Sequence, residues 1–200
     1  VHVAREGRNI VHLLSDYRIG RFPERGEVKV AAFVGEESDP LTGTPLTVAG
    51  QEVRTYTPWG QIALMAGGLE GYELVRENDL AGIAPARATF EKALGDSPVL
   101  ILIDELVLYM ARALALPEKH PRHKVNSQWA TFLQVLLAVA ARRPRTAVIL
   151  TLPSEQDANR KLTGELKQYL PSVLETVDEL EKTTARNARS LTPTQSNERA

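Results

Sequence analysis

The chain has 200 residues, of which 43% are hydrophobic and 24% are charged, and its formal net charge is -1. This length and balance are typical of one folded domain, and the near-neutral charge gives no electrostatic argument for a nucleic-acid or membrane partner. The absence of cysteine excludes disulfides and thiolate metal sites. No apolar stretch approaches the roughly 20 residues of a membrane span. Residues 1–9 lack the apolar core of a signal peptide, so we expect a cytoplasmic protein.

The start of the chain predicts the end of a helix followed by a strand. Apolar residues recur there at helical spacing: Ile10, Leu13, Leu14 and Tyr17. The apolar run of residues 28–34 is rich in strand-forming residues and predicts a strand that ends at Gly35. The acidic residues that follow it, beginning with Glu36, therefore lie at an edge of the sheet.

A hairpin and several helices are predicted next. Residues 46–48 pair with residues 53–56 around a turn at Gly50. Thr57 and Pro58 are a helix-start signal, with threonine as the N-cap and proline at the first helical position. Two glycines, Gly67 and Gly68, end that helix. Two more helices are predicted before the central strand, over residues 72–80 and 86–94.

The central strand is an unbroken aliphatic run closed by two acids. Residues 99–103 show no alternation, which is typical of a parallel strand buried on both faces. Asp104 and Glu105 therefore lie at its C-terminal edge, where open α/β sheets bind ligands. This is the pattern of a Walker B element, whose first acid holds the magnesium ion of a nucleotide and whose second polarises water. The alternative is that both acids only begin the helix of residues 106–116, where carboxylates are favourable.

The second half of the chain predicts a loop, a long helix and a third strand. Residues 117–124 are polar and contain two prolines, so we expect an exposed loop. Asn126 is the expected cap of the next helix. The apolar stripe of that helix is the clearest in the chain: Trp129, Phe132, Leu133, Leu136 and Leu137. Residues 146–152 predict the third buried strand.

The last predicted elements are helical. Ser154 with Asp157 can begin a helix, and an apolar stripe then continues to about Thr184. Pro171 either kinks this helix or begins a second one. The residues from 186 onward are polar and show no periodicity.

Three apolar strands separated by helices predict an α/β fold. Consecutive parallel strands need crossovers, so residues 28–34, 99–103 and 146–152 favour a three-layer parallel sheet with helices on both faces. Thr151 lies near the end of the third strand, where some nucleotidases place a residue that senses the γ-phosphate. Thr151 or Ser154 is a candidate for this role. The alternative is that Thr151 is an ordinary β-branched strand residue and Ser154 only a helix cap.

A phosphate-binding loop is missing from the chain. The P-loop pattern G-x-x-x-x-G-K-[ST] requires a lysine after glycine, and none of the 13 glycines is followed by lysine. Either the protein is not a nucleotidase, or the loop lies before Val1. Without a P-loop, we expect these 200 residues alone to be inactive.

Two further groups of side chains have open interpretations. His120 and His123 could bind a metal, although a solvated loop explains them more simply. Arg142, Arg143 and Arg145 could reach a neighbouring subunit's phosphate or a nucleic acid. A basic last turn of a helix is the alternative for these arginines.

Six segments of the sequence resemble, in order, a family of large prokaryotic AAA-like ATPases, the domain-of-unknown-function 499 family. These segments are VAAFVGEESDP, TPWGQIALMAGG, YELVRENDLAGIAPA, SPVLILIDELVLYMARAL, ILTLPSE and TPTQSNE. The resemblance covers nearly the whole chain. It implies that residues 1–185 are part of an ATPase core whose P-loop lies upstream, and that residues 186–200 are a polar tail or linker to a further region.

The resemblance also implies roles and a strand order. ATP and Mg²⁺ would be bound, with Asp104 as the magnesium-associated acid and Glu105 as the catalytic base. The strand of residues 99–103 would lie between the other two, which leaves residues 146–152 as an open edge. Family members occur with DNA-processing and phage-defence genes, so work on nucleic acid and a homo-oligomer are expectations from the resemblance. The alternative function is a non-catalytic α/β scaffold that binds a partner.

Overall fold

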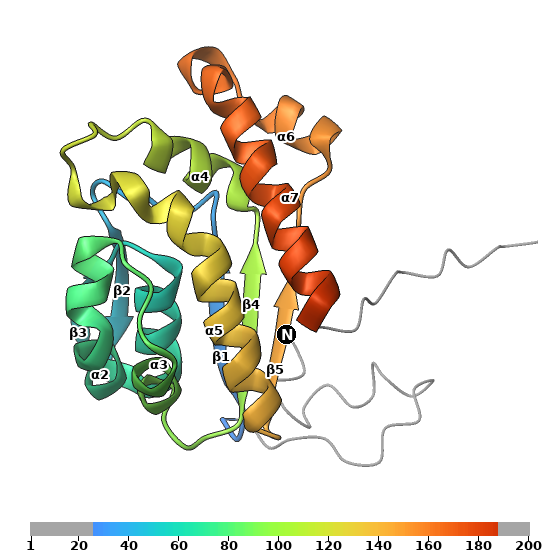
Figure 1. The fold of residues 1–200 in the computed structure, drawn as a ribbon. Coiled ribbons are helices and arrows are strands. Elements are labelled where there is room, and N and C mark those ends of the chain that lie inside the picture. The colour runs from blue at the N-terminus through green and yellow to red at the C-terminus, as the bar shows by residue number, and fades with distance from the viewer. Residues whose placement is uncertain (1–25, 188–200) are drawn as a thin grey trace, which may run out of the picture.

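A three-stranded parallel sheet organises the fold. The structure is a computed structural model, which describes residues 26–187 and their side chains as far as residue 185. The strands lie in the order β1-β4-β5 (Figure 1). Their bounds are Lys29–Val34 for β1, Val99–Asp104 for β4 and Thr146–Leu150 for β5. The helix predicted to end near Tyr17 and the polar tail after Asn187 lie outside the described residues.

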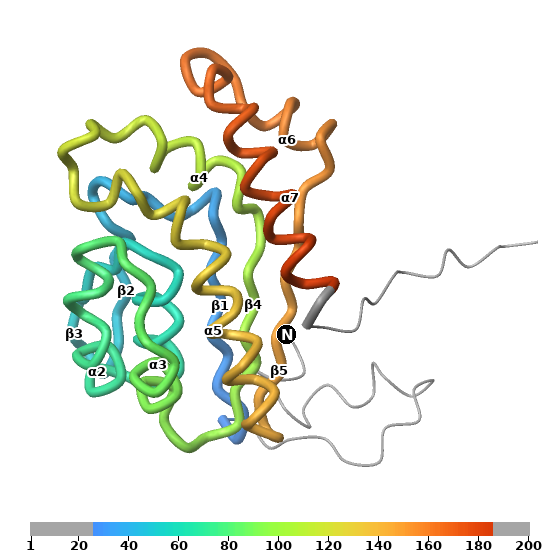
Figure 2. Tube along the Cα trace, viewed as in Figure 1, coloured from blue at the N-terminus to red at the C-terminus, as the bar shows by residue number. Residues whose placement is uncertain are grey.

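The register confirms the predicted strand order and brings the strand ends together. Val34 pairs with Asp104, and Ile103 pairs with Leu150, so all three strands end at one rim of the sheet. Segments far apart in the sequence therefore lie side by side at this rim (Figure 2). The third strand ends at Leu150, two residues earlier than predicted, so Thr151 is the first residue after β5.

The first half of the chain forms the elements that its turn residues predict. The hairpin consists of β2 (Thr44–Val48) and β3 (Gln51–Thr55), as expected. Helix α2 (Pro58–Ala81) is capped by the Thr57 hydroxyl, which accepts a hydrogen bond from the amide of Gly60. At Gly68 the backbone leaves the helical region, with φ 69° and ψ -159°, so α2 consists of two helical pieces. Helix α3 (Arg87–Ala93) follows.

The second half contains the remaining helices: α4 (Leu106–Leu114), the 3-10 helix η2 (Pro121–Gln128), α5 (Trp129–Arg142), α6 (Glu155–Lys161), the 3-10 helix η3 (Gly164–Tyr169) and α7 (Leu170–Asn187). Pro171 lies in the first turn of α7, which confirms the second of its two predicted roles. No helix among residues 26–187 combines the length and the apolar character needed to cross a bilayer.

Two predictions between α4 and α5 were wrong. The segment expected to be a loop forms η2 from Pro121 onward. Asn126 does not cap α5, because it lies inside η2, where its buried side chain donates a hydrogen bond to the carbonyl of Met110 at 2.7 Å. Gln128 occupies the N-cap position of α5 and makes no capping hydrogen bond. The asparagine thus ties η2 to α4 rather than beginning the next helix.

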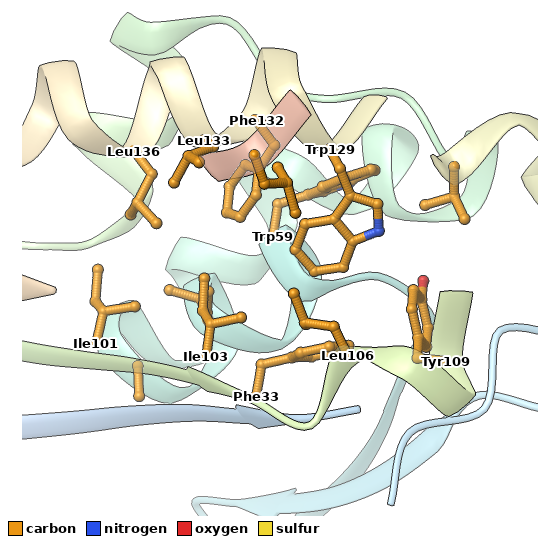
Figure 3. Packing of buried hydrophobic residues seen from close by; sticks show 14 of the residues in the cluster. Phe33, Trp59, Ile101, Ile103, Leu106, Tyr109, Trp129, Phe132, Leu133 and Leu136 are labelled. Atoms are coloured by element: carbon orange, nitrogen blue, oxygen red, sulfur yellow. The ribbon is translucent and has the colours of Figure 1, made fainter. Parts of the chain in front are cut away.

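The main core lies on one face of the sheet, under α2, α3 and α5. Aromatic rings fill it (Figure 3): the rings of Phe33 and Trp129 are 5.9 Å apart, and those of Trp59 and Phe132 are 5.4 Å apart. Alternate strand residues on this face, such as Ile101 and Ile103, are fully buried. The apolar stripe predicted for α5 therefore packs on the sheet.

The opposite face of the sheet is less buried than the core face, and the two edge strands have different neighbours. Leu100 and Leu102 are only partly buried, and Ile149 is 51% exposed. Helices were predicted on both faces, but within the described residues the helices that contact the sheet lie on one face only. At the outer edge of β1, the amide nitrogen of Gln61 donates to the carbonyl of Ala32 at 2.8 Å. Strand β5 forms the other edge, as expected.

Candidate functional site

The acidic pair lies where β4 ends and α4 begins. Asp104 is the last residue of β4, and Glu105 occupies the N-cap position of α4. The loop after β1 closes tightly over this junction, because a Cβ atom on Gly35 would lie 2.3 Å from the carbonyl oxygen of Glu105. The amide of Gly35 also donates to the carbonyl of Asp104 at 2.8 Å. Only glycine allows this approach between the ends of two strands.

The side chain of Asp104 is exposed at the rim and is held by two donors. Its Oδ1 atom accepts hydrogen bonds from the hydroxyl of Thr151 and from the amide of Glu105, the latter at 2.8 Å. The first donor belongs to the segment after β5. The structure therefore brings together Asp104 and Thr151, which the sequence singled out separately.

Glu105 has a strained backbone and a single strong partner. Its φ of 55° and ψ of 43° lie in the left-handed region, which costs a residue other than glycine about 1–2 kcal/mol. Its carboxylate forms an ion pair with Lys161, the last residue of α6, at 2.6 Å between Nζ and Oε1. The same Nζ lies 3.7 Å from the carboxylate of Glu36. Lys161 thus links the rim loops that follow β1, β4 and β5.

The ion pair shifts both partners in the direction of their charged forms. The hydrogen bond from Lys161 lowers the pKa of Glu105, and the neighbouring Glu36 acts in the same direction. The hydrogen bond to Glu105 raises the pKa of Lys161. The side chain of Glu105 makes no capping hydrogen bond to α4. Its position at the start of α4 nevertheless agrees with the alternative, in which carboxylates favour a helix N-terminus.

A small pocket of about 160 Å³ opens at this rim. Its charged lining residues are Asp104, Glu105, Asp157 and Lys161, and Thr151 contributes a hydroxyl. The ligand atoms that the lining offers are mainly oxygens, which magnesium prefers, and the one cation in the lining, Lys161, is paired with Glu105. Among residues 26–187 no group of three or more His, Asp or Glu side chains could hold a metal alone.

Ser154 does not join this site. Its hydroxyl donates to the carboxylate of Asp157 at 2.6 Å and accepts from the amide of the same residue at 3.2 Å. Ser154 is the N-cap of α6, so the helix-cap interpretation is confirmed for this residue. The phosphate-sensing role of Thr151 or Ser154 stays a prediction, and of the two only Thr151 lines the pocket.

The arginine cluster lies at the other rim of the sheet, where β5 begins. Arg143 is held by carbonyl groups, at 2.5 Å to Gly95 and 3.3 Å to Glu91, so its guanidinium is part of the structure. Arg142 lies in the last turn of α5, as the alternative expected. Arg145 donates to the carbonyl of Asp96 at 3.3 Å. None of the three contacts the acidic rim.

The two histidines have local partners that explain them. The Nδ1 atom of His120 accepts a hydrogen bond from the amide of Arg122 at 3.2 Å and so caps η2. The Nδ1 atom of His123 lies 2.7 Å from the carbonyl of Leu116. These contacts place both rings in the chain reversal between α4 and α5.

Sequence reasoning missed three residues that shape the rim. Lys161 is 56 residues from Glu105, and nothing in the pattern around it predicts the ion pair. Arg112 holds the loop after β1 by donating to the carbonyls of Glu36 and Ser38 at 3.0 and 3.1 Å. Gly35 was expected only to end a strand. The one signal for Gly35 in the sequence was its position directly after an apolar run that ends at the same rim as the run of residues 99–103.

Comparison with known proteins gives one match. The family model described as the DUF499 N-terminal domain matches residues 5–189, which is most of the chain. No curated protein and no solved structure matches it. Five of the six ordered segments noted in the sequence lie within this match, and the sixth, TPTQSNE, lies beyond its end. The chain therefore belongs to the DUF499 family, by way of its N-terminal domain.

Proposed function

We propose that the rim around Asp104 is part of an ATP-binding and ATP-hydrolysing site. In this proposal Asp104 associates with Mg²⁺, Glu105 acts as the base that activates water, and Thr151 senses the γ-phosphate. The observation that supports it best is the hydrogen bond between Thr151 and Asp104 beside Glu105, at the C-terminal end of parallel strands.

The residues at the rim fit a magnesium ion that arrives with a nucleotide. Magnesium is usually bound through one or two carboxylates together with substrate phosphates and water, rather than by a full set of protein ligands. Asp104 supplies such a carboxylate, and Thr151 supplies a neighbouring hydroxyl. A bound ion would stabilise negative charge on the transferring phosphoryl group. The lack of a larger acidic cluster among the described residues is consistent with this mode of binding.

The pocket accounts for only part of such a site. Its volume of about 160 Å³ is below the roughly 300–1,000 Å³ of sites that enclose a whole ligand. A terminal phosphate and its ion are the parts of a nucleotide that this volume suits. The backbone cradle for the other phosphates would then come from outside residues 26–187, which agrees with the P-loop that the family resemblance places upstream of Val1.

ATP hydrolysis by a longer protein that includes the upstream P-loop tests the proposal. We expect Glu105→Gln to lower kcat by about 100-fold or more, because a positioned base contributes on the order of 10²–10⁴ in rate. Binding of Mg·ATP should persist in this variant, since the amide keeps the size of the side chain. Glu37→Gln is the matched control, because Glu37 is an exposed acid of the same rim that does not line the pocket.

Unchanged turnover in Glu105→Gln would remove the proposed base. A protein that neither binds nor hydrolyses ATP would favour the scaffold function instead. Among the described residues no strand pairs with the outer edge of β5, and this favours that second candidate, since such an edge can add a strand from another chain. A backbone-mediated complex that forms without nucleotide would support it.

A further inference from the structure

The exposed face of the sheet is apolar across all three strands. Two rows of residues in register make up this face: Val30, Leu100 and Ala147 in one row, and Ala32, Leu102 and Ile149 in the other. Ile149 and Ala147 are exposed, and the other four are partly buried. None of the six belongs to the main hydrophobic core or packs against it. We name this set the open face.

The open face has the composition of an interior. Parallel sheets are almost always covered on both sides, and their strands are accordingly aliphatic on both sides, as β4 is here. On the covered side, Ile101 and Ile103 are almost inaccessible to solvent. Burying a side chain such as Ile149 is favourable because it removes apolar surface from water. A cover for this face would therefore contribute substantially to stability.

We propose that the segment Ile10–Tyr17, which precedes β1, covers the open face with its apolar stripe. The spacing of Ile10, Leu13, Leu14 and Tyr17 places all four side chains on one side of a helix. Such a helix is about 12 Å long, and the strands beneath it are about 20 Å long. The helix is therefore short enough to lie within the length of the strands and to cross the face once.

The connection to β1 permits this placement. The residues between Tyr17 and Val28 can extend over about 33 Å, which is more than the length of the strand they lead into. A helix that precedes a parallel strand runs antiparallel to it across the sheet. Because β1 begins at the rim that carries the arginines, the residues before Ile10 would emerge at the acidic rim, near Glu36 and Asp104.

Cysteine reactivity tests the cover in the full 200-residue chain, which has no native cysteine. Ile149→Cys probes the open face, and Ile83→Cys is a matched control because the two native side chains are 51% and 54% exposed. We expect a thiol reagent to modify Ile149→Cys about tenfold or more slowly than Ile83→Cys, since the site must first open. Adding Leu13→Asp with Leu14→Asp should abolish this difference and leave the control unchanged.

A second measurement requires no charged substitution. Under mild oxidation, Leu14→Cys with Ile149→Cys should form a disulfide within one chain, and Leu14→Cys with Ile83→Cys should not. Equal modification rates for the two single cysteines, or equal crosslinking of the two pairs, would overturn the proposal. Protection of Ile149→Cys that grows with protein concentration and survives the charged substitutions would also overturn it, and would assign the face to a second copy.

Discussion

Two acidic sites of this protein differ in the burial of their carboxylates and in the partners that hold them. Asp79 in α2 is fully buried, whereas Asp104 and Glu105 stand at the open rim. Asp79 accepts hydrogen bonds from the amides of Tyr56 and Thr57, at 3.1 and 2.7 Å, and from the hydroxyls of Thr57 and Tyr72. Every one of these partners lies within α2 or directly before it.

The difference separates a structural carboxylate from a candidate functional one. Asp79 fastens the second half of α2 to the start of the first half, and its hydrogen bonds offset the cost of burial. The rim acids have fewer donors, a strained backbone at Glu105 and a cation partner that is itself one third exposed. Such a site can exchange its partner for a ligand, whereas the buried one cannot. Burial with satisfied hydrogen bonds therefore indicates a structural role for Asp79, and exposure with backbone strain makes the rim acids candidates for a functional role.

The largest expected effect comes from removing the buried carboxylate. Asp79→Ala should lower the free energy of unfolding by about 3–4 kcal/mol, because several buried donors lose their acceptor at once. Urea denaturation of the full chain measures this change. Asp96→Ala is the control, since that side chain is exposed and should change stability by less than about 0.5 kcal/mol. Equal effects of the two substitutions would contradict the structural role of Asp79.

Adding a Cβ atom at Gly35, where two strand ends are in close contact, should have the next largest effect. Gly35→Ala would place a Cβ atom 2.3 Å from the Glu105 carbonyl oxygen and 2.8 Å from the Leu106 Cα, and both of these are backbone atoms. We expect a loss of about 1–3 kcal/mol from such overpacking. Gly50→Ala, in the hairpin turn, has open space around it and only its positive φ against it. A smaller loss at Gly35 than at Gly50 would show that the two strand ends are not in close contact.

At position 105, glycine should be better tolerated than alanine, because it relieves the backbone strain. Glu105→Gly and Glu105→Ala both remove the carboxylate and its ion pair, but only glycine adopts a φ of 55° without a steric cost. We expect the glycine variant to be more stable than the alanine variant by about 1 kcal/mol. Thermal unfolding of both variants measures the difference. Equal stability would mean that the backbone at this position is not strained.

The smallest expected effect is a difference in pH dependence. Burial raises the pKa of Asp79 above that of the unfolded chain, so between these two values the folded protein binds more protons than the unfolded one. Raising the pH through this window should therefore lower the free energy of unfolding. Asp79→Asn removes this contribution, so the wild type should lose stability relative to the variant as the pH rises above about 4. Parallel pH profiles of the two proteins would contradict the shift.

Local patterns predicted much of the fold. The aliphatic runs that became β1, β4 and β5, the turn at Gly50 and the break at Gly68 all depend on properties of neighbouring residues. Asn126 was misassigned because a capping residue and a residue of a 3-10 helix look alike in sequence, and a tertiary contact to Met110 decided between them.

The candidate site was predicted only where its residues adjoin a strand. Asp104, Glu105 and Thr151 each end a strand or follow one, and parallel topology then brings them to one rim. The pairing of Lys161 with Glu105 and the approach of Gly35 depend on how separate loops fold over each other. Neither is encoded in a spacing that can be recognised in a single sequence.

The hydrogen bond from Gln61 to β1 makes the two edges of the sheet unequal as places to add a strand. Among residues 26–187, the amide of Gln61 occupies the outward carbonyl of Ala32 in β1, whereas no strand pairs with the outer edge of β5. A newcomer aligned with its neighbours would release its following loop immediately next to Thr151. A chain that joins the sheet beside β5 would therefore reach the acidic rim directly.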